Sequence, residues 1–225
     1  MKIAITGATG DIAQELVKKL NHHELILLSR NFVSLKAVYG QLDAKFLDYR
    51  QLDEVGEIDI LINNAGFAVF DELSNLTETQ IDEMFQVNVI DVIKLTKRLQ
   101  PKVQLINIAS SAGKLPTAKS TIYAATKAAV LAFSDALRME NPNLKILTVN
   151  TGPVKTKFHA ANPDYLTKVG KNVISAEFVA AQIVKNLNTK KRELWLPRKM
   201  LFLVKFRALF PIIFDKISIK FYNYK

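Results

Sequence analysis

Short apolar runs alternate along the chain with longer segments whose apolar residues recur at helical spacing. Runs rich in Ile, Leu and Val are typical of strands buried on both faces of a parallel sheet, and the longer segments are typical of covering helices. The predicted strands are Lys2–Ile5, Glu24–Leu28, Ala44–Leu47, Ile58–Ile62, Val103–Ile108, Lys145–Asn150 and Glu193–Leu196. The predicted helices are Asp11–Leu20, Phe32–Tyr39, Thr77–Leu99, Ile122–Glu140 and Ala176–Leu187. The pattern predicts an α/β fold of the Rossmann type, a doubly wound parallel sheet of about seven strands with helices on both faces.

The length and composition fit one such domain followed by a tail. The chain has 225 residues, of which 49% are hydrophobic and 23% are charged, and this composition suffices for a substantial core. The segment from Asp48 to Glu57 leaves little room for a full crossover helix, so this element is predicted to be abbreviated. The composition changes after Pro197. We therefore expect a Rossmann-fold domain over residues 1–197 and an apolar, basic helical tail over residues 198–225.

Charge and cysteine content narrow the partners and the compartment. The formal net charge is +10, but residues 190–225 hold ten Lys and Arg against two acids, so the excess lies in the tail. Because no recognisable nucleic-acid-binding module accompanies this charge, no nucleic-acid partner is predicted. The chain has no cysteine, and its first residues form a predicted strand that leaves no room for a signal peptide. These features predict a cytoplasmic protein.

The first predicted strand runs directly into a glycine-containing turn. The turn reads Thr6-Gly7-Ala8-Thr9-Gly10-Asp11-Ile12-Ala13 and precedes a predicted helix. Glycine at positions 7 and 10 lets the backbone turn tightly and approach a pyrophosphate, whose charge the N-terminus of the helix would stabilise. An ordinary strand-to-helix turn is the alternative. The cofactor contacts predicted here are Gly7, Thr9, Gly10, Asp11 and Ile12.

The second predicted strand is followed by a cation without an acid, in the pair Ser29-Arg30. In dinucleotide-binding folds this position meets the adenosine ribose, where an acid binds the 2′-hydroxyl and an arginine accommodates a 2′-phosphate. A guanidinium paired with a phosphate makes charge-assisted and often bidentate hydrogen bonds. The sequence therefore favours NADP(H) over NAD(H), with a solvated surface arginine as the alternative for Arg30.

A tyrosine and a lysine lie four residues apart in an Ala-rich predicted helix. This spacing places Tyr123 and Lys127 on the same helical face. A nearby ammonium stabilises the ionised form of a phenol, which brings a pKa of about 10 closer to the working pH. Tyr123 could then exchange a proton with a carbonyl or alcohol oxygen. Such pairs are also common on surface helices, so the pair alone does not predict catalysis.

A further short motif, Asn63-Asn64-Ala65-Gly66, follows the fourth predicted strand. It resembles the NNAG motif of the short-chain dehydrogenases/reductases, and the resemblance extends over roughly residues 1–195 with the motifs in the order of that family. It implies direct hydride transfer between a nicotinamide and a carbonyl carbon, with no metal required. It also implies that Asn64, Ala65 and Gly66 line the adenosine end of the cofactor and that Asp48 contacts the adenine.

The same resemblance implies two more catalytic residues. Ser110 lies thirteen residues before Tyr123 and resembles the serine that hydrogen-bonds the substrate oxygen in the family, with Ser111 as the neighbouring candidate. Asn88 matches the asparagine that completes a proton relay through Lys127 and the ribose, and a buried structural amide is the alternative.

After the sixth predicted strand, Thr151-Gly152-Pro153-Val154-Lys155-Thr156 is similar to the PG-motif loop of the family, with Thr151 in place of its usual proline. The resemblance implies that this loop closes over the nicotinamide. Its implied cofactor contacts are Pro153, Val154 and Thr156, the last of them to the carboxamide. In the following segment, His159 is expected to be a solvated loop residue.

Asp11 departs from the family pattern, because this position near the phosphates is usually a glycine. We expect its side chain to cap the following helix by accepting hydrogen bonds from free backbone N–H groups. Its charge would also weaken dinucleotide binding.

Beyond Pro197, apolar and aromatic residues are interspersed with cations. Lys205, Arg207, Pro211 and Asp215 interrupt the apolar run, so no transmembrane helix is predicted. Two alternatives stay open: the tail lies in an anionic membrane interface, or its helices pack on a partner subunit or over the substrate cleft. The first alternative would place the protein at the inner face of a membrane and would favour an apolar substrate.

Taken together, the motifs predict an NADP(H)-dependent oxidoreductase that interconverts a carbonyl and an alcohol in a small molecule. A dinucleotide-binding sensor or scaffold without catalysis, acting through its tail on a membrane or partner, is the main alternative. An epimerase or dehydratase fits the glycine turn, but those enzymes carry a larger substrate domain than this chain can hold. The family resemblance also suggests a homodimer or homotetramer.

Overall fold

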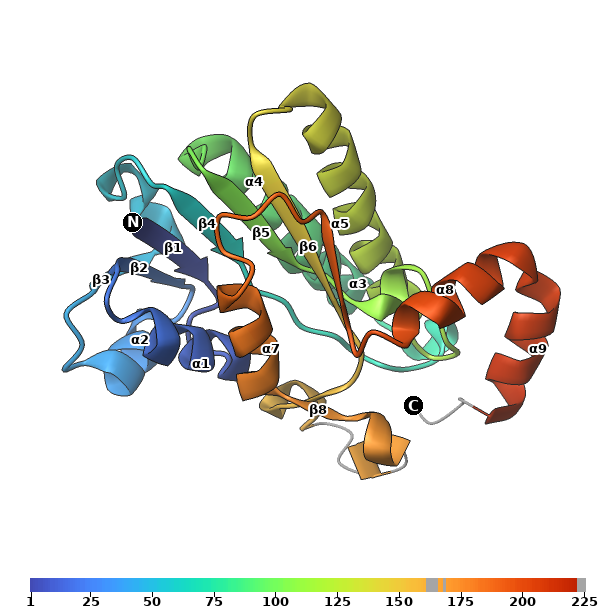
Figure 1. Ribbon diagram of the computed structural model, residues 1–225. Helices are drawn as coiled ribbons and strands as arrows, with labels where there is room; N and C mark the ends of the chain where they lie inside the picture. The colour runs from blue at the N-terminus through green and yellow to red at the C-terminus, as the bar shows by residue number, and fades with distance from the viewer. Residues whose placement is uncertain (161–165, 168, 222–225) are drawn as a thin grey trace.

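The computed structural model describes residues 1–160, 166–167 and 169–221, and within them a parallel sheet of seven strands forms the centre of the molecule (Figure 1). The strands are β1 Lys2–Thr6, β2 Glu24–Ser29, β3 Lys45–Asp48, β4 Ile60–Asn63, β5 Gln104–Ile108, β6 Lys145–Thr151 and β9 Glu193–Leu196. Their spatial order is β3-β2-β1-β4-β5-β6-β9, and each pairs in parallel with its neighbours. This order confirms the predicted Rossmann-type fold.

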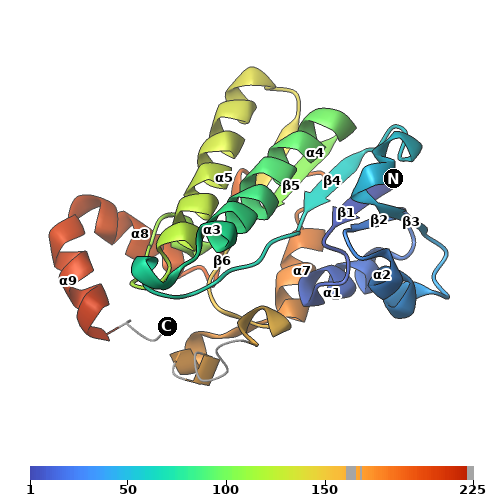
Figure 2. The ribbon, with the colours of Figure 1, turned by 180° about the vertical axis from the view of Figure 1, so that it is seen from behind.

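Helices cover both faces of the sheet (Figures 1 and 2). The helices of the domain are α1 Asp11–Leu20, α2 Phe32–Tyr39, α3 Glu78–Phe85, α4 Asp91–Leu99, α5 Thr121–Glu140 and α7 Ala176–Val184. Residues of α1, α2 and α7 pack in one hydrophobic core, and residues of α4 and α5 pack in a second core on the other face. The sheet therefore forms the middle of three layers, as a doubly wound fold requires.

The alternation of side chains along each strand feeds both cores. Ile3 and Ile5 of β1 join the core that contains α1 and α7, whereas Ala4 between them joins the core that contains α4. All three residues are fully buried, because β1 lies in the sheet between β2 and β4. The apolar runs of the sequence thus reflect burial on both faces rather than on one.

Two of the segments between strands are not regular α-helices throughout. The crossover between β3 and β4 contains only the 3-10 helix Tyr49–Glu54, which agrees with the abbreviated element expected there. The helix predicted over Thr77–Leu99 is instead divided into α3 and α4 by a π-helical turn at Gln86–Ile90. The backbone stays helical from Glu78 to Leu99, so the predicted helix is confirmed, and only the bulge, which side-chain contacts of Asn88 to other segments accompany, was not revealed by periodicity.

The chain ends in two helices that project from the carboxyl edge of the sheet (Figures 1 and 2). They are α8 Met200–Leu209 and α9 Pro211–Phe221. Residues 222–225 of the predicted tail lie outside the described residues. A small two-stranded sheet, β7 Val154–Lys155 with β8 Ile174–Ser175, precedes α7 and was not predicted. Within the described residues, no helix is long and apolar enough to cross a membrane.

Candidate active site

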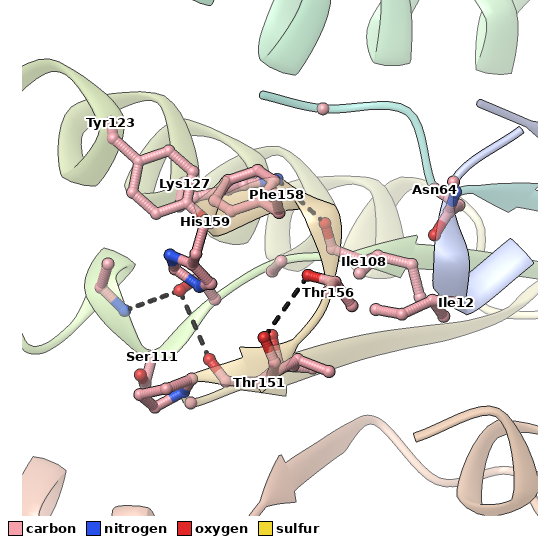
Figure 3. Close-up of a pocket in the computed structure, with 18 of the residues that line it drawn as sticks. Ile12, Asn64, Ile108, Ser111, Tyr123, Lys127, Thr151, Thr156, Phe158 and His159 are labelled. Atoms are coloured by element: carbon pink, nitrogen blue, oxygen red, sulfur yellow. Dashed lines mark hydrogen bonds between the residues drawn. The ribbon is translucent and has the colours of Figure 1, made fainter. Parts of the chain in front are cut away.

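A cavity of about 1110 Å³ opens at the carboxyl ends of the central strands (Figure 3). It is lined by residues from the glycine turn, the NNAG motif, the strand end after β5, the start of α5 and the loop after β6. The predicted site residues on its wall are Gly7, Thr9, Gly10, Asp11, Ile12, Arg30, Asn64, Ala65, Gly66, Ser110, Tyr123, Lys127, Pro153, Val154 and Thr156. Asp48 and Asn88 are not among its lining residues. The structure thus brings together side chains that are far apart in the sequence.

The glycine turn is held against the NNAG motif by close backbone contact. Gly7 has φ +60, and a Cβ atom at this position would lie 2.6 Å from the Cα of Ala65. The Asn64 side chain donates to the carbonyls of Thr6 and Gly7, at 3.2 and 3.0 Å, while the Thr6 hydroxyl accepts from the backbone N–H groups of Asn64 and Ala65. Only glycine combines this φ with this approach, so the turn requires a glycine at position 7.

Asp11 does not cap helix α1. Gly10 occupies the N-cap position and has no side-chain cap, and Asp11 is the first helical residue. Its Oδ2 atom instead accepts a 2.6 Å hydrogen bond from the backbone N–H of Lys157, which belongs to the loop after β6. The capping prediction was therefore wrong, because a backbone N–H donor in a distant segment, and not the start of α1, binds the carboxylate. The contact joins the glycine turn to the loop on the opposite side of the cavity.

Two tyrosines that were not predicted, the buried Tyr39 and the half-buried Tyr49, also support the glycine turn. The Tyr49 hydroxyl accepts a 3.1 Å hydrogen bond from the Gly7 N–H, and the Tyr39 hydroxyl donates to the carbonyl of Ala8 at 2.7 Å. Burial raises the pKa of both phenols above the usual range of tyrosine, which keeps them neutral. Tyr49 lines the cavity directly. Its place next to Asp48, at the end of the third strand, was the available sequence signal.

Arg30 follows the carboxyl end of β2, and its exposed side chain lines the cavity beside the buried Ser29. Asn31 caps α2 by accepting from the Ser34 N–H, which fixes where the chain turns away after Arg30. Asp48 lies at the end of the neighbouring strand β3 and is buried. A guanidinium therefore stands at the cavity edge where a dinucleotide-binding fold holds the adenosine ribose.

Ser110 lies two residues after the end of β5, and its side chain is fixed by two hydrogen bonds. Its Oγ atom accepts from the Ala112 N–H at 3.1 Å and donates to the Thr151 carbonyl at 3.3 Å. These contacts tie the ends of β5 and β6 together. Ser111 is equally buried and also lines the cavity, so burial alone does not separate the two candidates.

Tyr123 and Lys127 lie one turn apart on α5 and both face the cavity (Figure 3). The Lys127 ammonium lies 5.7 Å from the centroid of the Tyr123 ring and donates a 3.1 Å hydrogen bond to the Ile108 carbonyl. Burial lowers the pKa of Lys127 from its usual 10.5 to about 8. The amine is thus a cation at neutral pH that titrates close to the physiological range.

Asn88 is fully buried in the π-helical turn. Its Oδ1 atom accepts from the Phe67 N–H at 3.0 Å, and its Nδ2 atom donates to the Phe67 carbonyl and to the Thr126 hydroxyl. A Cβ atom on Gly66 would lie 3.2 Å from Asn88 Oδ1 and 3.4 Å from Lys127 Nζ, so the three groups are neighbours. These contacts fit a structural amide, and they place it beside Lys127.

Aromatic side chains surround Tyr123 on the cavity side. The ring centroids of Phe70 and Phe158 lie 5.4 and 5.7 Å from that of Tyr123, and His159 stacks on Phe70 at 6.0 Å (Figure 3). Both Phe70 and Phe158 line the cavity, although neither was predicted. His159 is half-buried in this cluster rather than solvated, which corrects the expectation from its loop position. The chemistry around the phenol is therefore largely apolar.

The C-terminal helices complete the wall at this end of the cavity. The contributing residues are Lys199, Met200, Phe202, Leu203, Phe214 and Ser218. Lys199 also donates to the side chain of Asn172, and a Cβ atom on Gly152 would meet Met200 at 4.0 Å. The tail thus packs over the cleft, which is one of the arrangements left open by the sequence.

The fold and the cavity at the carboxyl ends of its strands are those of a dinucleotide-binding protein. Residues 1–165 match the sequence model of a family described as short chain dehydrogenase. The chain belongs to the short chain dehydrogenase family, and it is an enzyme that acts on CH–OH or C=O groups.

Individual relatives agree with this membership. An NADP-dependent 3-hydroxy acid dehydrogenase of Schizosaccharomyces pombe is 29% identical over 187 residues, which cover 69% of this chain and 72% of that protein. The ketoacyl reductase HetN of Nostoc sp. is 33% identical over 127 residues, or 54% of this chain and 41% of that protein. A short-chain dehydrogenase from Sphingobium yanoikuyae, solved with NADPH, has a TM-score of 0.79 at 22% identity and covers 96% of this chain and 95% of its own.

Proposed function

We propose that this protein is an NADP(H)-dependent carbonyl reductase or alcohol dehydrogenase in which Tyr123 exchanges the proton. The observation that carries the proposal is the shared cavity: Ser110, Tyr123 and Lys127 line the same space as the glycine turn. A phenol, a hydroxyl and a cation therefore lie within reach of one bound molecule. The NADP-dependent relative of S. pombe supports the choice of cofactor.

The residues at the strand ends fit a dinucleotide. Gly7 and Gly10 line the surface of the cavity at the N-terminus of α1, where backbone N–H groups favour an anionic group. Arg30 stands at the far end of this surface, where it would hold a 2′-phosphate. The residues proposed to line the rest of the cofactor are Thr9, Ile12, Asn64, Ala65, Gly66, Pro153, Val154 and Thr156. When bound, the nicotinamide would supply or accept the hydride at the substrate carbon.

The side chains at the Tyr123 end of the cavity transfer the proton. In the direction of reduction, Tyr123 gives its phenolic proton to the carbonyl oxygen as that oxygen gains negative charge. The Ser110 Oγ atom is held by the Ala112 N–H, and its one proton, which the Thr151 carbonyl accepts in the structure, would turn to stabilise the same oxygen. The Lys127 ammonium stabilises the phenolate that Tyr123 leaves behind. Asn88 then acts as a positioning residue beside Lys127, rather than as a group that touches the substrate.

The walls around Tyr123 favour a substrate with an apolar portion. Phe70 and Phe158 flank the phenol, and Phe202 and Phe214 line the same cavity from the tail. The names of two relatives, a 3-hydroxy acid dehydrogenase and a ketoacyl reductase, are consistent with a carbonyl or alcohol on such a chain. The homodimeric or homotetrameric state and the cytoplasmic location stay predictions.

Replacing Tyr123 by Phe tests the assignment. We expect turnover of a carbonyl panel with NADPH to fall by about a hundredfold or more, because the proton donor is lost while the ring is kept. Fluorescence titration should show NADPH binding close to that of the unmodified protein. A Tyr123→Phe variant that keeps its turnover would overturn the role of the phenol.

The two serines provide a matched pair for the second test. Ser110→Ala should reduce kcat by about a hundredfold, as expected when a donor to the developing oxyanion is removed, whereas Ser111→Ala should reduce it much less. The reverse order would transfer the role to Ser111. Unmodified protein that binds NADPH but reduces no member of the panel would indicate the dinucleotide-binding scaffold instead.

A further inference from the structure

The outer surface of the C-terminal helices carries an unusual set of exposed apolar side chains. We define the hairpin face as Phe202, Leu209, Ile212, Ile213, Ile217 and Ile219 of α8 and α9. Phe202, Leu209 and Ile212 are 76%, 74% and 72% exposed, and the other three are exposed as well. Six exposed apolar side chains gathered on two helices that contact each other are more than the single scattered positions of an ordinary surface, and they point to a binding surface.

The same helices present a different side to the cavity. Phe214 and Ser218 lie four residues apart on α9, are buried, and line the cavity together with Leu203 of α8. Ile213 and Ile217 lie at the preceding positions and face outward with the same spacing. The hairpin is therefore a thin wall, with the cavity on one side and the hairpin face on the other. Phe202 belongs to both, because it is exposed and also lines the cavity.

Cations accompany the apolar side chains of the hairpin. Lys205 and Lys216 are exposed on α8 and α9, and Arg198 is exposed just before them. Arg207 pairs with Asp215 at 3.1 Å, which neutralises one of the two acids among residues 190–225. Residues 198–221 hold six Lys and Arg against the single acid Asp215, which leaves the hairpin basic. Apolar side chains interspersed with Lys and Arg suit the boundary of a bilayer that contains anionic lipids.

We propose that the hairpin face docks on the surface of an anionic lipid bilayer and that the cavity takes an apolar carbonyl or alcohol from that bilayer. The helices have ten and eleven residues and are about 15 Å long, half the thickness of a hydrocarbon core, so they lie in the interface. Docking on the bilayer does not depend on the proposed catalytic activity. The substrate part rests on the proposed function, and it follows from the single wall between lipid and cavity.

A second copy of the chain is a poorer occupant of this surface. In a symmetric dimer the same patch would meet itself, which would bring Lys205 and Lys216 of one protomer close to those of the other. Anionic headgroups would instead pair with these cations. The charge of the hairpin therefore favours lipid over self-association.

Sedimentation with vesicles tests the docking. The full chain should pellet with phosphatidylcholine vesicles that contain phosphatidylglycerol, and a smaller fraction should pellet with vesicles of phosphatidylcholine alone. High salt should reduce the fraction that pellets with the anionic vesicles. The triple variant Leu209→Gln, Ile213→Gln and Ile217→Gln changes side chains that do not line the cavity. Its partition coefficient should fall by at least about tenfold, because three apolar side chains no longer enter the interface.

A matched control makes the same kind of change at exposed apolar side chains elsewhere. Val38, Leu73 and Met139 are exposed and lie outside the cavity, so replacing all three by Gln should leave vesicle binding unchanged. Equal pelleting of the hairpin variant and the unmodified chain would overturn the proposal. A second result would also overturn it: the unmodified chain does not bind vesicles, and light scattering without lipid shows a dimer that the hairpin substitutions dissociate.

The origin of the substrate is tested by comparing two substrates. NADPH oxidation is followed with a short water-soluble ketone and with a long-chain ketone dissolved in the same anionic vesicles. The ratio of the vesicle-borne rate to the soluble rate should fall by about tenfold in the hairpin variant and stay constant in the control. An unchanged ratio would overturn the bilayer as the source. Vesicle binding without reduction of either ketone would instead overturn the proposed function and leave the docking surface standing.

Discussion

The two ends of the cavity are built in different ways. At the glycine turn, backbone atoms and half-buried polar side chains hold one another, as in the contacts of Asn64 and Tyr49 with Gly7. Around Tyr123, aromatic rings and the C-terminal helices form the wall. The first end belongs to residues 1–165 that match the family, and α8 and α9 lie beyond them.

This difference separates what the fold must preserve from what a substrate can change. A dinucleotide offers the same phosphates to every enzyme that binds it, so the turn is fixed by backbone geometry that few sequences satisfy. A substrate pocket made of rings and a terminal hairpin changes shape with ordinary side-chain substitutions. We expect changes at the glycine turn to affect stability and cofactor affinity, and changes at the hairpin to affect substrate selection.

Replacing Lys127 by Met should give the largest effect, because this residue serves the chemistry at the expense of stability. Turnover should fall by about a hundredfold or more, since no cation stabilises the phenolate of Tyr123. The free energy of unfolding at pH 7 should rise by about 2 kcal/mol, because a charge that is costly to bury is replaced by an apolar chain. This value is the net gain after the loss of the hydrogen bond to the Ile108 carbonyl. Chemical denaturation together with NADPH oxidation measures both effects.

The pH dependence of that stability gain has a definite sign. In the folded protein Lys127 loses its proton at about pH 8, whereas in the unfolded chain it keeps the proton up to about 10.5. Between these values the unfolded state binds more protons, so the stability of the unmodified protein rises with pH. The advantage of Lys127→Met should therefore shrink from pH 8 to pH 10.5. A constant or growing difference would contradict the lowered pKa.

Gly7→Ala should break the other end of the cavity. The new Cβ atom would lie 2.6 Å from the Cα of Ala65, and the alanine residue would have to adopt φ +60. We therefore expect the free energy of unfolding to fall by about 2–4 kcal/mol. Gly56→Ala is the matched control, because Gly56 has φ +67 but its Cβ atom would meet only the end of the Lys2 side chain, at 3.6 Å. Equal losses in the two variants would show that backbone strain, and not the close approach, dominates.

Arg30→Ala should act on cofactor choice rather than on stability. Loss of a charge-assisted contact to a 2′-phosphate should weaken NADPH binding by about 10- to 100-fold and leave NADH binding almost unchanged. Arg98→Ala removes an exposed arginine that pairs with Asp53 outside the cavity, and it should change neither affinity. Fluorescence titration of both cofactors gives the ratio. An unchanged ratio in Arg30→Ala would remove the arginine from the site.

The elements that the sequence predicted are those whose pattern follows directly from burial. The strands were predictable because residues such as Ile3, Ala4 and Ile5 must be apolar on both faces of the sheet. The π-helical turn was not, because Asn88 contacts Phe67 and Thr126, which lie 21 and 38 residues away in the sequence. A bulge that accompanies tertiary contacts leaves no trace in helical periodicity.

The same distinction applies to the site. Short motifs located Gly7, Ser110, Tyr123 and Lys127, because their spacing is tied to a turn or to one helical face. Phe70 was missed, since a single aromatic residue in a loop has no spacing that separates a cavity wall from an ordinary surface position. The cavity forms only when separate loops and the tail meet, which requires the three-dimensional structure.

Asp11 should show the smallest effect, and it links the two ends of the cavity. Its carboxylate accepts from the Lys157 N–H across the site, while its charge stands beside the proposed phosphate position. Asp11→Asn keeps an oxygen acceptor but removes the charge, so NADPH should bind about two- to fivefold more tightly, with the gain reduced at high salt. Asp11→Ala removes both, and proteolysis after Lys157 should become faster in this variant than in Asp11→Asn. If the two variants are cleaved at the same rate, the hydrogen bond does not hold the loop.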